Sequence, residues 1–161
     1  MAVAWSPCST YLASGDMDGT IIIWDPRTAK PLHGTKMLQS HSKSITALVW
    51  QPLKDSNTGS GVSNTSILLA SASRDGTIRI WNVRNGTCIH IFTGHTQSIR
   101  TLKWGGAGYL YSGSQDRSIK VWDFKKRTLH CTLDGHRHWV NTLSTNTDYT
   151  LRLGPYNKDG S

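Results

Sequence analysis

Three segments of the chain align with one another without gaps: SGDMDGTIIIW at 14–24, SASRDGTIRIW at 71–81 and SGSQDRSIKVW at 112–122. Each begins with a serine, has an aspartate four residues later, and ends with a tryptophan six residues after that. The residues between the aspartate and the tryptophan alternate or run apolar and β-branched, a pattern that predicts a strand. The Asp-Gly and Asp-Arg pairs predict a tight turn before that strand. The chain therefore contains a hairpin that recurs.

A second set of landmarks follows the same period. The segments are SHSKSITALVW at 40–50, GHTQSIRTLKW at 94–104 and GHRHWVNTLST at 135–145. His95 and His136 are 41 residues apart, as are the tryptophans of the last two hairpins, whereas the first two histidines are 54 apart. The additional 13 residues fit within 53–66, whose Ser, Asn and Gly content predicts a flexible surface loop. The first copy carries about three further residues near 33–37.

This period and its landmarks resemble the WD40 repeat, in which each repeat forms one four-stranded blade of a β-propeller. The Trp-Asp dipeptide occurs at Trp24 and at Trp122, and the second copy has Trp81 followed by Asn82. The resemblance covers nearly the whole chain. It implies an all-β fold, a WD40 propeller with about three and a half blades present, as a fragment of a larger ring. The expected copies are about 1–39, 40–93 and 94–134, with the start of a fourth at 135–161.

Four strands are expected in each complete copy. They are Val3–Trp5, Tyr11–Gly15, Thr20–Trp24 and about Lys36–Gln39; Ile45–Trp50, Ile67–Ala72, Thr77–Trp81 and Cys88–Phe92; Ile99–Trp104, Tyr109–Gly113, Ser118–Trp122 and Leu129–Leu133. A fourth copy is expected to begin with Trp139–Ser144 and Thr150–Leu153.

Serine, histidine and aspartate are the components of a hydrolase triad, so two interpretations compete. In the WD40 family these residue types form a structural hydrogen-bond chain with a tryptophan inside each blade. The motif places that chain at His41, Ser71, Asp75 and Trp81 in the second copy and at His95, Ser112, Asp116 and Trp122 in the third. The first copy retains Ser14, Asp18 and Trp24, and its histidine would lie before residue 1. A catalytic triad would be unique, whereas this set recurs, and no G-x-S-x-G elbow is present. We therefore expect a non-enzymatic protein with no catalytic residues.

Other candidate sites point to binding instead. In WD40 proteins the residues beside the turn aspartate and after the histidine often line the narrow top face, which here are Met17, Lys43, Arg74, Gln97, Gln115, Arg137 and His138. His130 and Cys131 alternate on a strand and cannot easily share a metal, and the pair His136 and His138 is assigned to a structural and a surface role. We expect no metal, no cofactor and no small-molecule substrate.

Charge and cysteine content narrow the partners and the compartment. The formal net charge is +8, which suits polyanions such as RNA as well as a merely soluble surface. The three cysteines never occur as C-x-x-C, which favours a reducing compartment. No secretory signal is apparent, and no apolar run approaches the roughly 18 residues of a membrane helix, so no membrane partner is expected.

The third and fourth copies carry more particular segments, GHTQSIRTLKWGGAGYLYSGSQDRSIKVW and GHRHWVNTLSTNTDYTLRLGPY. They resemble the Notchless family of WD40 proteins. That resemblance implies an eight-bladed propeller beside an N-terminal ubiquitin-like domain, which engages an AAA ATPase during large ribosomal subunit assembly. It also implies binding of pre-ribosomal RNA and assembly factors, a nucleolar or nuclear location with the cytoplasm as a further one, and a link to Notch signalling. A generic WD40 adaptor, such as a ubiquitin-ligase substrate receptor or a signalling scaffold, is the alternative.

The chain departs from that family's pattern in two ways. We expect no ubiquitin-like domain within these 161 residues, and we expect about three and a half blades. An open ring would expose strand edges and apolar faces. We therefore expect a fragment, a truncated product or part of a larger chain, and a dimer that closes a seven-bladed ring is a less favoured option.

Overall fold

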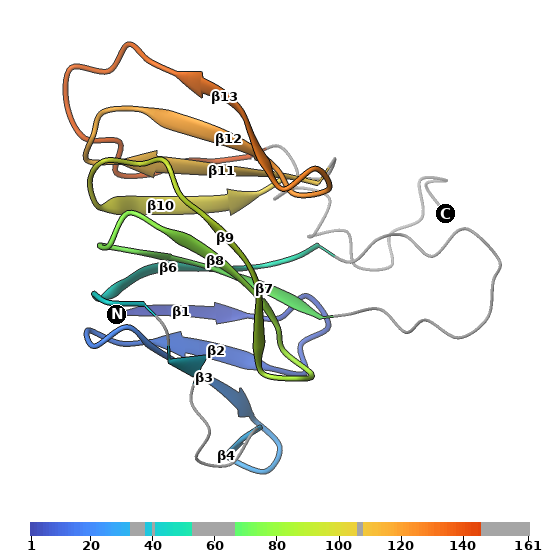
Figure 1. Cartoon of the computed structure of the whole chain (residues 1–161). Coiled ribbons are helices and arrows are strands. Elements are labelled where there is room, and N and C mark those ends of the chain that lie inside the picture. The colour runs from blue at the N-terminus through green and yellow to red at the C-terminus, as the bar shows by residue number, and fades with distance from the viewer. Residues whose placement is uncertain (33–37, 40, 53–66, 106–107, 146–161) are drawn as a thin grey trace, which may run out of the picture.

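The computed structural model describes residues 1–32, 38–39, 41–52, 67–105 and 108–145 of the chain. Within these residues every regular element is a β-strand, and none is a helix long and apolar enough to cross a membrane. The strands form three antiparallel sheets that stack on one another (Figure 1). The all-β expectation is therefore confirmed.

Each sheet is a meander of strands that are consecutive in the chain. The first contains β1 (Ala2–Trp5), β2 (Leu12–Gly15), β3 (Thr20–Asp25), β4 (Lys30–Pro31) and β5 (Leu38–Gln39), the last two both pairing with β3. The second contains β6 (Ile45–Trp50), β7 (Leu68–Ser73), β8 (Ile78–Asn82) and β9 (Thr87–Phe92). The third contains β10 (Ile99–Trp104), β11 (Tyr109–Ser114), β12 (Ile119–Asp123) and β13 (Thr128–Leu133).

The repeated hairpin is the turn before β3, β8 and β12. These turns lie at the same end of the stack, where Figure 1 marks the N-terminus. The residue after the turn aspartate has a left-handed backbone in all three copies, with φ of 82° at Gly19, 81° at Gly76 and 70° at Arg117. Glycine adopts this conformation without steric cost, whereas arginine pays for its Cβ. The Asp-Arg turn of the third copy is therefore the strained one.

Two apolar layers hold the three sheets together. Between the first and second sheets lie buried side chains such as Ile23, Trp50 and Trp81. Between the second and third sheets lie others such as Ile80 and Trp122. All six residues of β7, the second strand of the middle sheet, are buried, because this strand has a neighbouring sheet on each face.

The sheets are also joined by hydrogen bonds at the level of the innermost strands. The Trp50 indole N–H donates to the Ala4 carbonyl oxygen at 2.9 Å, which links β6 to β1. The Ile45 N–H donates to the Asp16 carbonyl oxygen at 2.9 Å, and the Val140 N–H donates to the Ser114 carbonyl oxygen at 3.0 Å. The last two of these bonds connect the start of one copy to the hairpin turn of the copy before it.

Most of the expected strands agree with the structure to within one residue, but two differ. The expected strand Trp139–Ser144 is wrong: these residues lie outside any strand, although Val140 is buried against Gly113. A strand is defined by its ladder with a neighbour, and the expected neighbour, Thr150–Leu153, lies outside the described residues. The expected strand Lys36–Gln39 is represented by Leu38–Gln39 and is preceded by β4. The proposed loop at 53–66 and the insertion at 33–37 also lie outside the described residues.

Candidate functional site

In the third sheet, one histidine, one serine, one aspartate and one tryptophan form a continuous hydrogen-bond chain. Ser112 Oγ lies 2.8 Å from Trp122 Nε1 and 2.7 Å from His95 Nε2. His95 Nδ1 lies 2.7 Å from Asp116 Oδ2. Strands β11 and β12 place the serine and tryptophan at diagonal positions, because Ser112 pairs with Lys120 and Trp122 pairs with Leu110. The hairpin turn between the two strands brings the aspartate to the histidine. The fold therefore brings together four residues that span 28 positions of sequence, from 95 to 122.

The second sheet repeats this arrangement with nearly the same distances. Ser71 Oγ lies 2.9 Å from Trp81 Nε1 and 2.8 Å from His41 Nε2, and His41 Nδ1 lies 2.9 Å from Asp75 Oδ2. The second oxygen of Asp75 accepts from the Thr77 hydroxyl at 2.7 Å and from the Thr77 N–H at 2.9 Å. The carboxylate therefore closes the hairpin turn as well as holding the histidine.

The donor and acceptor roles along this hydrogen-bond chain follow from the two groups at its ends, the tryptophan indole and the aspartate carboxylate. An indole N–H can only donate and a carboxylate can only accept. The Trp122 N–H therefore donates to Ser112 Oγ, the Ser112 hydroxyl donates to His95 Nε2, and the His95 Nδ1–H donates to Asp116. This order requires a neutral imidazole with its hydrogen on Nδ1. Every polar atom along the path has a partner, as buried polar groups require.

Burial and hydrogen bonding set the charge states. Burial of His95 outweighs its attraction to Asp116 and lowers the pKa of its imidazole below the ordinary value, so the ring is neutral at pH 7. Burial opposes ionisation of Asp116, but hydrogen bonds from Ser118 and His95 outweigh it and lower the pKa of the carboxyl to about 2. Burial likewise opposes ionisation of Asp75, and hydrogen bonds from His41 and Thr77 hold its pKa well below the ordinary range.

The first sheet departs from the expected tetrad. The Trp24 indole N–H donates to Ser14 Oγ at 2.8 Å, as in the other copies. Asp18 is exposed, and its carboxylate has no partner within the described part of the chain. Asp16 closes the turn instead, because its Oδ1 accepts from the N–H groups of Asp18 at 2.9 Å and Thr20 at 2.8 Å. The structure therefore does not place Asp18 in a hydrogen-bond chain with Ser14 and Trp24.

The geometry is unsuited to nucleophilic catalysis. The side chains of Ser71 and Ser112 are 0% exposed, so no substrate carbonyl can approach either hydroxyl. Each Oγ already accepts from an indole N–H and bonds to the imidazole. A catalytic serine needs an open position in front of its oxygen, with donors for the developing oxyanion. What this arrangement can do is tie a hairpin to the segment that precedes the innermost strand.

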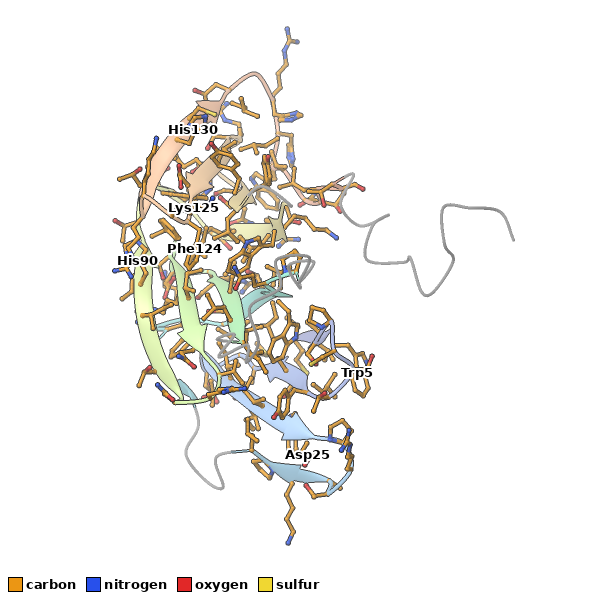
Figure 2. All side chains as sticks on the ribbon, turned by 90° about the vertical axis from the view of Figure 1, so that its right-hand side faces the viewer. Trp5, Asp25, His90, Phe124, Lys125 and His130 are labelled. Carbon is orange, nitrogen blue, oxygen red and sulfur yellow. The ribbon has the colours of Figure 1, made fainter. Side chains whose placement is uncertain are left out.

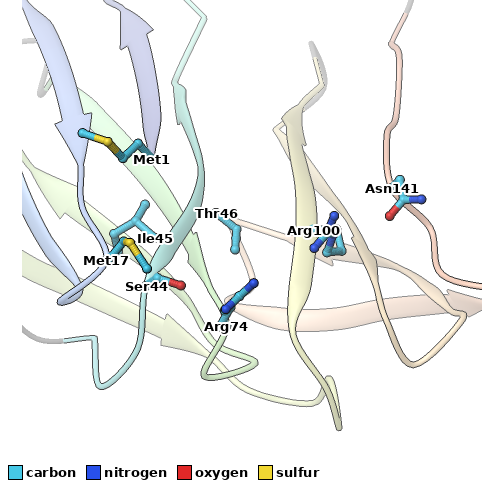
Figure 3. Close-up of a pocket in the computed structure, with 8 residues that line it drawn as sticks. All are labelled: Met1, Met17, Ser44, Ile45, Thr46, Arg74, Arg100 and Asn141. Atoms are coloured by element: carbon cyan, nitrogen blue, oxygen red, sulfur yellow. The ribbon is translucent and has the colours of Figure 1, made fainter.

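The expected top-face residues lie at the tetrad end of the stack. Lys43, Gln97, Arg137 and His138 are exposed and Gln115 is half-buried. Met17 and Arg74 line one pocket, together with Arg100, which the sequence reasoning did not select (Figure 3). The 41-residue repeat could have identified this position, because Arg100 and Asn141 occupy equivalent places in successive copies, 41 residues apart like His95 and His136.

The family model described as "WD domain, G-beta repeat" matches residues 1–25, 33–82 and 86–123. The chain belongs to the WD40 family. Each of the three sheets is thus a WD40 blade, and the chain as described is a partial propeller.

Curated relatives share these WD40 repeats. Protein Notchless of Drosophila melanogaster is 41% identical over 198 residues, which cover 97% of this chain and 39% of that protein. The "Ribosome biogenesis protein WDR12 homolog" of Nematostella vectensis is 30% identical over 68% of this chain and 24% of that protein. The "F-box/WD repeat-containing protein sel-10" of Caenorhabditis elegans is 29% identical over 60% of this chain and 14% of that protein. The chain thus spans well under half the length of these relatives.

Solved WD40 structures superimpose well on the chain. The structure of U3-55K has a TM-score of 0.72 and 26% sequence identity, covering 88% of this chain and 41% of that one. This likeness agrees with the three stacked blades and with the absence of helices among the described residues.

A basic region lies on the outer side of the WD40 blades. Figure 2 shows His90 of β9, Lys125 and His130 on the same side of the molecule. Burial of His90, on β9 of the second blade, lowers the pKa of its imidazole. The charge of Arg127, in the turn after β12, lowers this pKa further because that turn lies close to β9. Lys126 is 77% exposed and only loosely paired with Asp123, at 4.0 Å. Lys125, Lys126 and Arg127 lie in the turn between β12 and β13, where charged side chains are common.

Proposed function

We propose that this chain is part of a non-enzymatic WD40 scaffold that acts in assembly of the large ribosomal subunit. The observation that carries the proposal is the 41% identity to Protein Notchless over 97% of the chain. The similarity to the WDR12 homolog, which is named as a ribosome biogenesis protein, also supports this proposal. The net charge of +8 favours contact with RNA as well as with assembly factors. The proposed location is the nucleolus and nucleus, with the cytoplasm as a further one; a role in Notch signalling is a secondary possibility.

We further propose that the two tetrads are structural and that the top face is the binding surface. In this assignment the repeats are about 1–39, 40–93, 94–134 and the start of a fourth at 135–161. The completeness of the hydrogen bonds supports a structural role, because each group serves another group of the same blade. The proposed binding role of the top face is supported by the exposure of its side chains, which include Met17, Lys43, Arg137 and His138.

Co-sedimentation tests the assembly role. A tagged copy of the chain is expressed in eukaryotic cells, and the lysate is separated on a sucrose gradient. We expect the chain in fractions that contain large-subunit precursors, with their pre-ribosomal RNA recovered on the tag. A folded variant that lacks two exposed cations of the top face, with Lys43 and Arg137 changed to Gln, should leave those fractions. The matched variant with Lys125 and Lys126 changed to Gln removes the same charge from the turn after β12 and should remain in them. Recovery of cullin and F-box partners, or sedimentation only as free protein, would replace the proposal by the adaptor alternative that the sel-10 relative suggests.

A further inference from the structure

A pocket of about 300 Å³ lies where the first, second and third blades converge (Figure 3). Its lining includes Met1, Met17, Thr46, Arg74, Arg100 and Asn141. Two recurring positions of the repeat supply these side chains. Met17 and Arg74 each precede the last aspartate of a hairpin turn, while Thr46 and Arg100 are each the second residue of an innermost strand. Because the innermost strands stand side by side, residues at those positions face one common space.

The charge in this pocket is unbalanced. Two guanidinium groups line it, and no carboxylate occurs among its described lining residues. Neither Arg74 nor Arg100 forms an ion pair within the described part of the chain. Two cations at one pocket repel each other, and the repulsion is relieved when an anion enters between them. Arginine also offers a planar set of donors that matches a carboxylate or a phosphate.

Both arginines are held in place by contacts that leave their donors available. The backbone N–H of Arg74 donates to the Ser44 carbonyl oxygen at 3.0 Å, which fixes the base of the side chain on the blade. The Arg100 guanidinium carbon lies 5.9 Å from the Trp139 ring centroid, so the aromatic ring supports one face of the group. The in-plane N–H groups of a guanidinium supported in this way remain free to bind an anion.

The other side of the pocket is apolar. Met17 is 70% exposed and Met1 is 95% exposed, although large apolar side chains are ordinarily covered. Methionine adapts its shape to varied apolar partners and is enriched at surfaces that bind peptides. An RNA backbone presents phosphates and sugars and would leave these methionines uncovered. A protein segment can supply an anion and an apolar side chain at adjacent positions.

We propose that this pocket binds an acidic side chain of a partner protein between Arg74 and Arg100, with a neighbouring apolar side chain of the same segment against the methionines. The anion is a carboxylate of Asp or Glu, or a phosphate on Ser or Thr; both offer the oxygen pair that a guanidinium recognises. The inference rests on the proposed scaffold function and names the kind of partner that the top face accepts.

A peptide array measured on the purified full chain tests this pocket. The probes are fluorescent octapeptides that place Glu, Asp or phosphoserine beside Leu or Met, with Gln or Ser counterparts of the same length, and a twelve-residue poly(U) RNA. Fluorescence polarisation gives the affinities, and comparison of the Glu and phosphoserine arms identifies the source of the anion. We expect acidic peptides to bind and their neutral counterparts to bind at least about tenfold more weakly, since hydrogen bonds to charged groups are stronger than those between neutral groups.

Variants assign the binding to the two arginines. Arg74→Gln and Arg100→Gln should each weaken the best acidic peptide about tenfold or more, Arg74→Lys less, and Met17→Ser severalfold. Arg27→Gln is the matched control, because Arg27 is exposed on the turn between β3 and β4, away from the pocket lining, and its loss removes the same charge. Thermal unfolding of each variant verifies that the fold is retained, which matters most at Arg100 because of its contact with Trp139.

Three results would overturn the proposal that this pocket binds an acidic side chain. They are absence of binding by every acidic peptide, equal affinity for acidic and neutral peptides, and equal weakening by Arg27→Gln and Arg74→Gln. Tight poly(U) binding that Arg74→Gln abolishes, with no peptide binding, would reassign the pocket to RNA. The peptide measurement involves no ribosomal component. Peptide binding without co-sedimentation would therefore refute the assembly role alone, and co-sedimentation without peptide binding would refute this pocket alone.

Discussion

The substitution Ser112→Ala removes one oxygen that serves two buried groups. Ser112 Oγ accepts from the Trp122 indole N–H at 2.8 Å and donates to His95 Nε2 at 2.7 Å. Trp122 is 2% exposed and the His95 side chain is 0% exposed, so water cannot take the place of the hydroxyl. Leaving one buried group unsatisfied costs about 1–3 kcal/mol. Two such groups give an expected loss of about 2–6 kcal/mol in the free energy of unfolding.

The chain contains its own controls for this substitution. Ser71→Ala leaves the same two kinds of group without a partner in the second blade, so it should lower the free energy of unfolding by a similar amount. Ser14→Ala leaves only the Trp24 indole N–H without its partner, and Trp24 is half-buried and within reach of water. It should cost about 1 kcal/mol. The ordering of the three variants therefore tests the hydrogen-bond chain itself, since each substitution deletes the same single atom.

Urea unfolding monitored by tryptophan fluorescence measures the three losses. A lower midpoint with an unchanged slope reports a change in stability rather than in the surface exposed on unfolding. A loss below about 1 kcal/mol for Ser112→Ala, or an equal loss for Ser14→Ala, would refute the reasoning. The indole N–H resonance of Trp122 provides a second readout, because it should shift in Ser112→Ala and exchange faster with solvent.

Three further predictions concern the turns, the blade interfaces and pH. Arg117→Gly should raise the free energy of unfolding by about 0.5–1 kcal/mol, because glycine relieves the strain at φ 70°; a lower urea midpoint would contradict this. Trp50→Phe should cost about 1–3 kcal/mol through the lost hydrogen bond to β1, whereas Trp5→Phe, at the same blade position but 58% exposed, should cost under about 0.5 kcal/mol; equal urea midpoints for the two would argue against the interface bond. Stability should fall as pH drops below about 6.5, since the folded chain holds the pKa of His95 below its unfolded value and the unfolded chain is protonated first. It should fall again between about pH 4 and 2 as Asp116 is protonated, because its folded pKa of about 2 lies below the unfolded value; urea midpoints that rise on acidification would contradict both statements.

The repeated pattern alone was sufficient to predict the hairpins, the three sheets and the partners of the two complete tetrads. His41, Ser71, Asp75 and Trp81 could be assigned to one blade because the contacts that join them lie within a single meander of strands. Such contacts are set by register and turn geometry, and the sequence encodes both as a fixed spacing. The same period carried the identification of the WD40 family.

Tertiary structure decided the features that depend on more than one blade or on a local substitution. Asp16 rather than Asp18 closes the first turn, because the Asp16 carboxylate accepts from the N–H groups of Asp18 and Thr20. Trp139–Ser144 pairs with no strand among the described residues, and a strand requires a ladder with a neighbour. Arg74, in the turn before β8, and Arg100, on β10, line one pocket because the second and third blades stack on each other. Spacing along the chain determines what lies within a blade, whereas the packing of one sheet on the next determines what lies between blades.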